Sequence, residues 1–271
     1  YLSSSANHIF DLTVGYASGS ALNTATSVQN AKKINIYNQM AAVLQGHDAS
    51  GNILQFDQDG DVTSGGTKIK ECVFMNFSRL LSKDEIKKGS FALTALTGGT
   101  PVAPTDALTI EDHGAASTYL TNSPAGEYAV LYTSSAAVAG TGVGLLYYQA
   151  GIAVLTASVF DGTFGAPAAT YDTSSIEAVL TGSEISSSCD GIRNRWEDCD
   201  YNNTTELNST IYFCRAGSNE FNYSSNPTYL SGSEIRVKKE STDSPSSYVT
   251  TIGLYSEDNE LLAVAKVSEP L

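Results

Sequence analysis

Three carboxylates at alternate positions, Asp57, Asp59 and Asp61, form the opening of a calcium-binding loop, because Ca²⁺ prefers such oxygen ligands. The rest of an EF-hand is missing. Its sixth position is Val62 in place of Gly, and its twelfth is Lys68 in place of a bidentate Glu. The alternative interpretation is a solvated Asp-Gly turn, and the pattern favours it. The three aspartates stay as metal candidates, and we predict no cofactor.

Nucleophilic catalysis needs a nucleophile beside a base that an acid orients. The chain has three histidines, at positions 8, 47 and 113, each next to Asn, Asp or Gly, and no Gly-x-Ser-x-Gly motif. Its four cysteines, at positions 72, 189, 199 and 214, include no Cys-x-x-Cys pair, which argues against a zinc site. We therefore predict that the protein is not an enzyme.

Aromatic side chains near the only tryptophan suggest a contact surface. Trp196 lies in an Arg-Asn-Arg-Trp-Glu-Asp stretch, and Phe221, Tyr223 and Tyr229 follow in an aromatic-rich segment. Exposed aromatic residues beside arginine favour a subunit interface. Burial within strands and loops is equally consistent with the pattern. All four residues are interface candidates.

Composition and charge exclude several partner classes. The chain has 271 residues, of which 16% are charged and 41% hydrophobic, with 15 basic against 29 acidic residues and a net charge of −14. Affinity for nucleic acid comes largely from Lys and Arg, so we predict no nucleic-acid partner. No apolar run approaches the roughly 20 residues of a membrane span, so we predict no span.

The hydrophobic pattern predicts a mainly β protein, with antiparallel sheets in a sandwich or barrel-like arrangement and one or two short helices. Apolar residues at helical spacing, followed by Gly46, predict a helix over residues 32–45. A shorter helix is expected at residues 174–180. The capping-box pattern from Ser82 to Glu85 predicts a helical turn that ends at Gly89.

Shifts in composition predict three regions. Residues 1–30 are Ser- and Ala-rich and have little apolar pattern, so we expect an N-terminal arm that becomes ordered on another chain. Residues 98–169 have very little charge and are rich in Ala and Gly, which indicates an inserted β-rich lobe. Residues 31–97 together with 170–271 would then form the main β domain.

The clearest hairpin of the chain lies at its C-terminal end, where strands over 248–255 and 261–267 flank a polar turn. Apolar residues alternate onto both of its faces, so we expect both faces to be covered, one by the sheet and one by the inserted lobe or another subunit. On this interpretation Ile252 and Leu254 are interface candidates. Truncating Ile252 to Ala would then cost about 2–5 kcal/mol.

Six stretches of the chain together resemble virion structural proteins of tailed phages, especially contractile-tailed marine cyanophages. These stretches are Ile34–Ala41, Asn76–Phe91, Val143–Thr156, Ser209–Arg215, Phe221–Tyr229 and Tyr248–Lys266. In addition, the segment Ile252–Ala265 is similar to the adaptor segments by which phage fibres join baseplates. Neither similarity carries catalytic residues.

The resemblance implies a structural component of a tailed-phage virion, assembled in the host cytoplasm, in the tail or baseplate or at a fibre attachment. Its partners would be other virion proteins and further copies of the same chain in a symmetric assembly. Two alternatives stay open. One is a neck or capsid-surface protein of the same virion, and the other is a receptor- or glycan-binding module.

Overall fold

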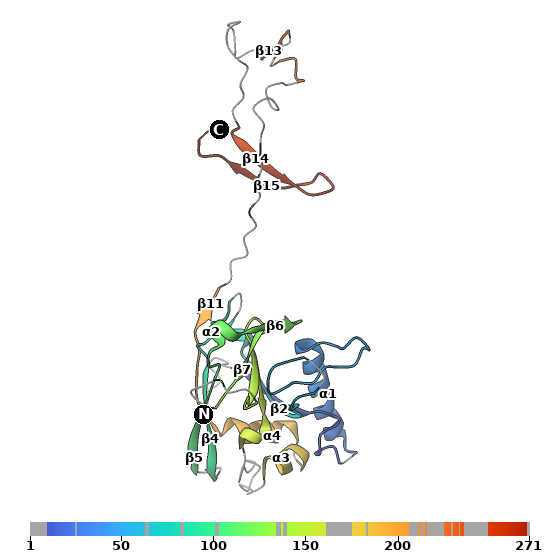
Figure 1. Ribbon diagram of the computed structural model, residues 1–271, viewed down its shortest axis with the longest axis vertical. Coiled ribbons are helices and arrows are strands. Elements are labelled where there is room, and N and C mark those ends of the chain that lie inside the picture. The colour runs from blue at the N-terminus through green and yellow to red at the C-terminus, as the bar shows by residue number, and fades with distance from the viewer. Residues whose placement is uncertain are drawn as a thin grey trace. The chain divides into compact units, whose positions relative to one another are not determined.

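The structure is a computed structural model, and the chain divides into two compact units, residues 1–207 and residues 208–271. Each unit is described by itself (Figure 1). The residues that the structure describes are 10–24, 26–62, 65–81, 84–100, 103–133, 137, 140–160, 175–182, 184–205, 211, 213, 215, 225–228, 230–232, 234–235 and 249–269.

An antiparallel six-stranded sheet forms the centre of the first unit, in the order β1-β2-β9-β8-β7-β6. Its strands are β1 (Asp11–Tyr16), β2 (Glu71–Asn76), β6 (Leu120–Ser123), β7 (Gly126–Leu131), β8 (Gly144–Tyr147) and β9 (Ile152–Thr156). Strands β8 and β9 form the hairpin that the apolar runs on either side of Ala150-Gly151 predict.

This sheet is buried on both faces, because successive side chains of a strand point to opposite sides. In β8, Leu145 and Tyr147 belong to one core cluster, and Leu146, with Tyr148 just after the strand, belongs to the other. Strands β2, β7 and β9 alternate in the same way. Consecutive apolar residues therefore mark a strand covered on both faces.

Helix α1 (Val28–Leu44) supplies the cover of one face with Tyr37, Ala41 and Leu44. The helix begins where the Ser27 side chain accepts a hydrogen bond from the Asn30 amide at 3.1 Å. It ends before Gly46, whose positive φ suits the residue after a helix. The predicted helix is confirmed, and it starts four residues earlier than expected.

The other face lies against a second sheet and two helices. This sheet has the order β10-β4-β5, with β4 (Ala92–Thr100), β5 (Ala103–Glu111) and β10 (Trp196–Asp200). Their apolar residues share a core cluster with the helices. The remaining elements of this unit are α2 (Ala115–Thr118), α3 (Ile176–Gly182), α4 (Ile185–Arg193), the 3-10 helices η1 (Ser78–Leu80) and η2 (Ala157–Phe160), and the short pair β3 (Glu85–Ile86) and β11 (Asn203–Thr204).

The described residues of the second unit form two hairpins. One joins β12 (Leu230–Ser231) and β13 (Glu234–Ile235), and the other joins β14 (Thr251–Tyr255) and β15 (Leu261–Lys266). The hairpin predicted at the C-terminal end is therefore confirmed. The apolar pattern of residues 207–216 predicts a strand, most of which lies outside the described residues.

The predicted fold class is confirmed, since the protein is mainly β with antiparallel sheets. The described residues hold four α-helices, more than the one or two expected. The predicted helical turn after Ser82 is wrong, because Glu85 and Ile86 pair with β11 as a strand. Tertiary pairing here prevails over the local capping pattern. No helix among the described residues has the length and apolarity needed to cross a membrane.

The division into units differs from the three regions expected from composition. Strand β9, from the expected inserted lobe, pairs along its length with β2, from the expected main domain. Strand β1, from the expected arm, pairs with the other edge of β2 as an edge strand, and Val14 and Tyr16 are buried there. Low charge in β7, β8 and β9 thus reflects a central sheet buried on both faces, whereas β5 belongs to the second sheet.

Candidate functional sites

The β14–β15 hairpin exposes a concentration of apolar side chains. Ile252 and Leu254, both expected at an interface, are 45% and 44% exposed. Four further large apolar residues of the hairpin are more exposed still: Tyr255, Leu261, Leu262 and Val264. The described residues of its own unit therefore leave Ile252 partly exposed, and the estimate for Ile252 as a core residue is corrected.

Gly253 gives the hairpin its local shape. The register shifts between Leu254 and Tyr255, which is a β-bulge. A Cβ at Gly253 would lie 3.0 Å from the Tyr255 ring and 3.4 Å from a Leu261 methyl group. The glycine thus allows these two side chains to fold across the strand. A glycine in the middle of a strand favours a bulge or a close approach, and the structure has both here.

Charges are segregated along this hairpin. Its turn carries Glu257 and Asp258, and Glu260 leads into β15, all exposed. The opposite end of β15 carries Lys266, also exposed. Between them β15 is entirely apolar. A strand with opposite charges at its ends and an apolar centre has a direction that an interacting strand can recognise.

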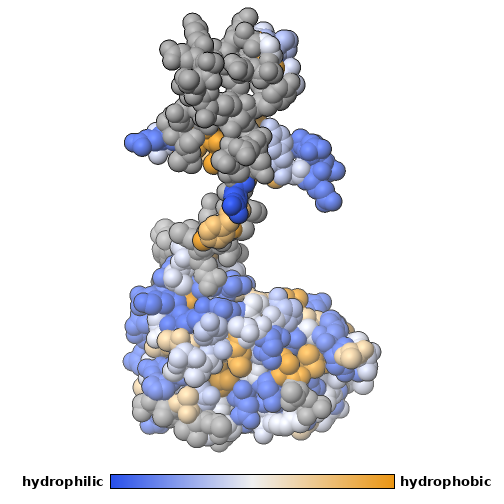
Figure 2. All heavy atoms as spheres, turned by 45° about the horizontal axis from the view of Figure 1, so that its top comes forward, coloured by the Kyte–Doolittle hydropathy of each residue, from blue (hydrophilic) through white to orange (hydrophobic). Residues whose placement is uncertain are grey.

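Two further residues of the second unit expose apolar surface. Ile211 and Phe213 are 74% and 95% exposed. These two side chains and those of the hairpin are the large apolar groups that the described residues of this unit expose. Figure 2 shows the first unit with mostly polar colours, interrupted by hydrophobic areas, on the face in view.

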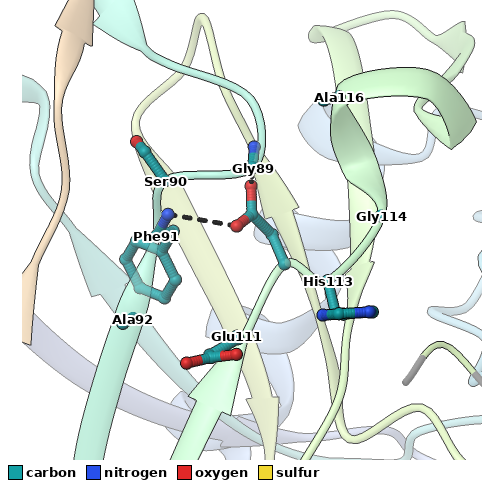
Figure 3. A pocket seen from close by; sticks show the side chains of 9 residues that line it. Gly89, Ser90, Phe91, Ala92, Glu111, His113, Gly114 and Ala116 are labelled. Carbon is teal, nitrogen blue, oxygen red and sulfur yellow. Dashed lines mark hydrogen bonds between the residues drawn. The ribbon is translucent and has the colours of Figure 1, made fainter. Parts of the chain in front are cut away.

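A hollow of about 380 Å³ lies in the first unit between the turn at Gly89 and the end of β5. Figure 3 shows the turn and the β5 end on its two sides. Its lining includes the Glu111 carboxylate and the His113 imidazole. Phe91 also borders it, but this residue is 1% exposed and its ring packs against Phe77 and Tyr201 in the core. The side chains available to a ligand are therefore a carboxylate and an imidazole.

Asp112 anchors the walls of this hollow, although it is only 2% exposed. Its carboxylate accepts hydrogen bonds from the amides of Gly89 at 2.7 Å and Phe91 at 3.0 Å, and from the Tyr148 hydroxyl at 2.8 Å. Burial raises the pKa of the Asp112 carboxyl, and these three hydrogen bonds act against that rise. Sequence analysis did not single out Asp112, because its partners are distant in sequence.

Ser90 and His113 both line the hollow, so a nucleophile and a base are of the right residue types. The Ser90 hydroxyl, however, donates to the Lys87 carbonyl at 2.7 Å and accepts from the Asn202 amide at 3.0 Å. These bonds join the β3–β4 turn to the segment before β11. The hydroxyl is therefore part of the fold's hydrogen bonding.

No protein-family model, curated protein or solved structure matches this chain. Functional arguments therefore depend on its residues.

The Asp57 segment forms the turn that the pattern favours. Asp57 is fully buried, and its carboxylate forms an ion pair with the Lys68 ammonium at 2.6 Å and accepts from the Asp59 amide at 2.9 Å. Gly66 has a positive φ, and a Cβ there would lie 2.6 Å from an Asp57 oxygen. Asp59 in turn accepts from the Gly140 amide. Within the described parts of the chain, no group of three His, Cys, Asp or Glu side chains is placed to hold a metal.

The aromatic candidates fall into two sets. Trp196 is half-buried in the first unit, where its ring packs edge-on against Phe160 at 5.5 Å between centroids. Its packing within its own chain agrees with the alternative that the sequence left open. Phe221, Tyr223 and Tyr229 lie outside the described residues. Among the described interface candidates, Ile252 and Leu254 lie together on β14.

Proposed function

We propose that this protein is a structural component of a tailed-phage virion that acts through subunit contacts in the tail or baseplate, or at a fibre attachment. The observation that supports it is the β14–β15 hairpin, with six large apolar side chains exposed on two strands. A two-stranded hairpin is at best marginally stable alone in water. Such a surface is suited to assembly.

The sequence resemblance supports the same proposal from an independent direction, because the hairpin coincides with the segment similar to fibre adaptors. Non-catalytic action is part of the proposal. It is supported by the Ser90 hydroxyl, which has a donor and an acceptor within the fold. The partners would be other virion proteins and further copies of this chain.

An electron-microscopy map of the intact particle tests the proposal. We expect density for this chain in the tail or baseplate region, with the β14–β15 hairpin in contact with other protein. Density at the neck or capsid surface would replace the proposed location with the alternative position. Particles whose proteins, identified by mass spectrometry, do not include this chain would refute a virion role.

The hollow beside Asp112 favours one alternative function, a receptor- or glycan-binding module. The Glu111 carboxylate and the His113 imidazole are groups that form hydrogen bonds with sugar hydroxyls. A glycan array probed with the wild type and with Glu111→Gln tests it. Binding that is lost in the variant would support this function, and no binding by either protein would exclude it for the glycans displayed.

A further inference from the structure

We propose that residues 202–205 form a releasable strap, which the Asp112 carboxylate holds closed through Ser90. The strap comprises β11 and one residue on each side of it, and it is the last described segment of the first unit. In the closed form it is bound to that unit, and in the open form it is detached while the core of the unit stays folded. The proposal goes beyond the virion role and does not depend on it.

The strap is held by hydrogen bonds and carries no large apolar side chain. Its sequence is Asn-Asn-Thr-Thr, and all of its residues except Thr204 are exposed. Asn203 and Thr204 pair with β3, and the Thr205 hydroxyl donates to the Asp84 carboxylate. A segment with exposed backbone hydrogen bonds and few buried apolar contacts opens at a lower free energy than the core does. We therefore expect the strap to open locally.

The start of the strap is fastened to the β3–β4 turn, residues 87–90. The Lys87 amide donates to the Asn202 carbonyl at 2.7 Å, and the Asn202 amide donates to the Ser90 hydroxyl at 3.0 Å. The Ser90 hydroxyl in turn donates to the Lys87 carbonyl at 2.7 Å. Asn202 is thus bound at both of its backbone groups, and each bond depends on the shape of the turn.

Asp112 sets the shape of this turn, because its carboxylate binds the residues on both sides of Ser90. The Gly89 amide donates to one oxygen at 2.7 Å, and the Phe91 amide donates to the other at 3.0 Å (Figure 3). The carboxylate is buried, which strengthens these bonds relative to bonds in water. Ser90 is therefore held between two fixed neighbours, and its hydroxyl is placed where the Asn202 amide reaches it.

Tyr201 marks the fixed end of the strap. Its ring packs edge-on against Phe77 with centroids 5.4 Å apart, and it stacks on Phe91 with centroids 6.4 Å apart. Both phenylalanines belong to a core cluster of the first unit, so opening stops at Tyr201. The four residues that are released span up to about 13 Å when extended, which adds to the reach of the link beyond residue 207. A partner that pulls on the second unit would favour the open form.

Hydrogen exchange of single amides, followed by NMR in the full chain, tests the strap. The Lys87 amide reports closure because its acceptor belongs to the strap, and the Ile69 amide, which donates to the Phe56 carbonyl, reports on the core. In the wild type we expect Lys87 to exchange faster than Ile69. Asp112→Asn should speed the exchange of Lys87 about tenfold, because the Asn side chain offers one acceptor oxygen to two amides.

Two serine variants separate opening of the strap from a general loss of stability. Ser90→Ala removes the hydroxyl that joins turn and strap, so we expect Lys87 to exchange about tenfold faster in this variant too. Ser27→Ala removes the hydroxyl that caps α1 and takes no part in the strap, so it should leave Lys87 exchange unchanged. If Asp112 acts through Ser90, adding Asp112→Asn to Ser90→Ala changes the exchange by less than about twofold.

Four results would overturn the proposal. Equal exchange of Lys87 and Ile69 in the wild type would show that the strap opens only when the unit unfolds. An unchanged Lys87 rate in Asp112→Asn, or an equal rise in Ser27→Ala, would remove Asp112 as the group that holds it. Additive effects of the Asp112 and Ser90 substitutions would refute the route through Ser90. Ser90→Ala decides by itself if Asp112→Asn does not fold, since an unchanged Lys87 rate there also refutes the strap.

Discussion

Asp112 illustrates at the scale of single residues how a buried carboxylate is held. Water is excluded from it, and two backbone amides with one phenol take its place. Its hydrogen bonds join the β3–β4 turn, the end of β5 and the residue after β8. The cost of burial is offset only while all three donors are present.

We expect Asp112→Asn to lower the free energy of unfolding by about 1–3 kcal/mol, because the new amide group cannot accept from the donors that face it. Because the pKa of Asp112 is raised, the loss of unfolding free energy in this variant depends on pH. The folded state holds the Asp112 proton more tightly than the unfolded state does. The stabilisation from this group is therefore complete below its ordinary pKa and is lost as the pH rises through the raised value.

The difference in stability between wild type and Asp112→Asn should accordingly be larger at acid pH than at neutral pH. Urea unfolding at a series of pH values measures it. A difference that grows from acid to neutral pH would contradict the raised pKa of Asp112.

Cys189 and Cys199 give a second prediction at this scale. Burial raises the pKa of the Cys189 thiol to about 11 and that of Cys199 to about 12, in each case with a neighbouring aspartate adding to the rise. Because the thiolate is the reactive form, we expect both to be alkylated slowly by iodoacetamide at pH 7.5 and rapidly in guanidinium. Peptide mapping by mass spectrometry measures both rates, and fast labelling of the folded protein would be the contrary result.

Among the elements, the β14–β15 hairpin departs furthest from its predicted environment. Its strands and turn follow from alternating apolar residues, but burial of Ile252 does not. We now expect Ile252→Ala to change the free energy of unfolding of the monomer by less than about 1 kcal/mol, because the side chain is 45% exposed. Buried Leu146→Ala in β8 is the contrast and should cost about 2–5 kcal/mol. Equal losses in thermal or urea unfolding would refute this distinction.

Helix α1 offers a prediction about capping. Ser27→Ala removes the side-chain acceptor of the Asn30 amide and should destabilise the first unit by about 1 kcal/mol. Thr26→Ala, at an exposed position one residue earlier, should have no measurable effect. If the two variants melt at the same temperature, the cap contributes nothing.

Sequence patterns were informative where one local rule sufficed. The unbroken apolar run Leu145–Tyr148 predicts a strand buried on both faces, and Gly46 predicts the end of a helix. Patterns failed where distant segments decide the outcome. Glu85 is in a strand because β11 pairs with it, and Asp112 gains importance only from Gly89 and Tyr148. The Asp57 turn is an intermediate case. The sequence pattern predicts the turn but not the ion pair between Asp57 and Lys68.

For the whole molecule, the division at residue 207 implies that the first unit carries its own core. Both core clusters consist entirely of residues before this boundary. We expect a fragment of residues 1–207 to fold and to unfold cooperatively at the same temperature as the main transition of the full chain. Calorimetry of the fragment and the full chain compares them, and an unfolded fragment would show that the second unit is required.

The pairing of β2 with β9 has a consequence during synthesis. Between Asn76 at the end of β2 and Ile152 at the start of β9 the ribosome must add about 75 residues. At about 5–20 residues per second, β2 waits on the order of 4–15 s for its second neighbour. Phe74 and Val73 have no β9 to pack beside during that interval. The nascent chain therefore exposes an apolar strand edge for seconds, the period in which a host chaperone that binds apolar segments has access to it.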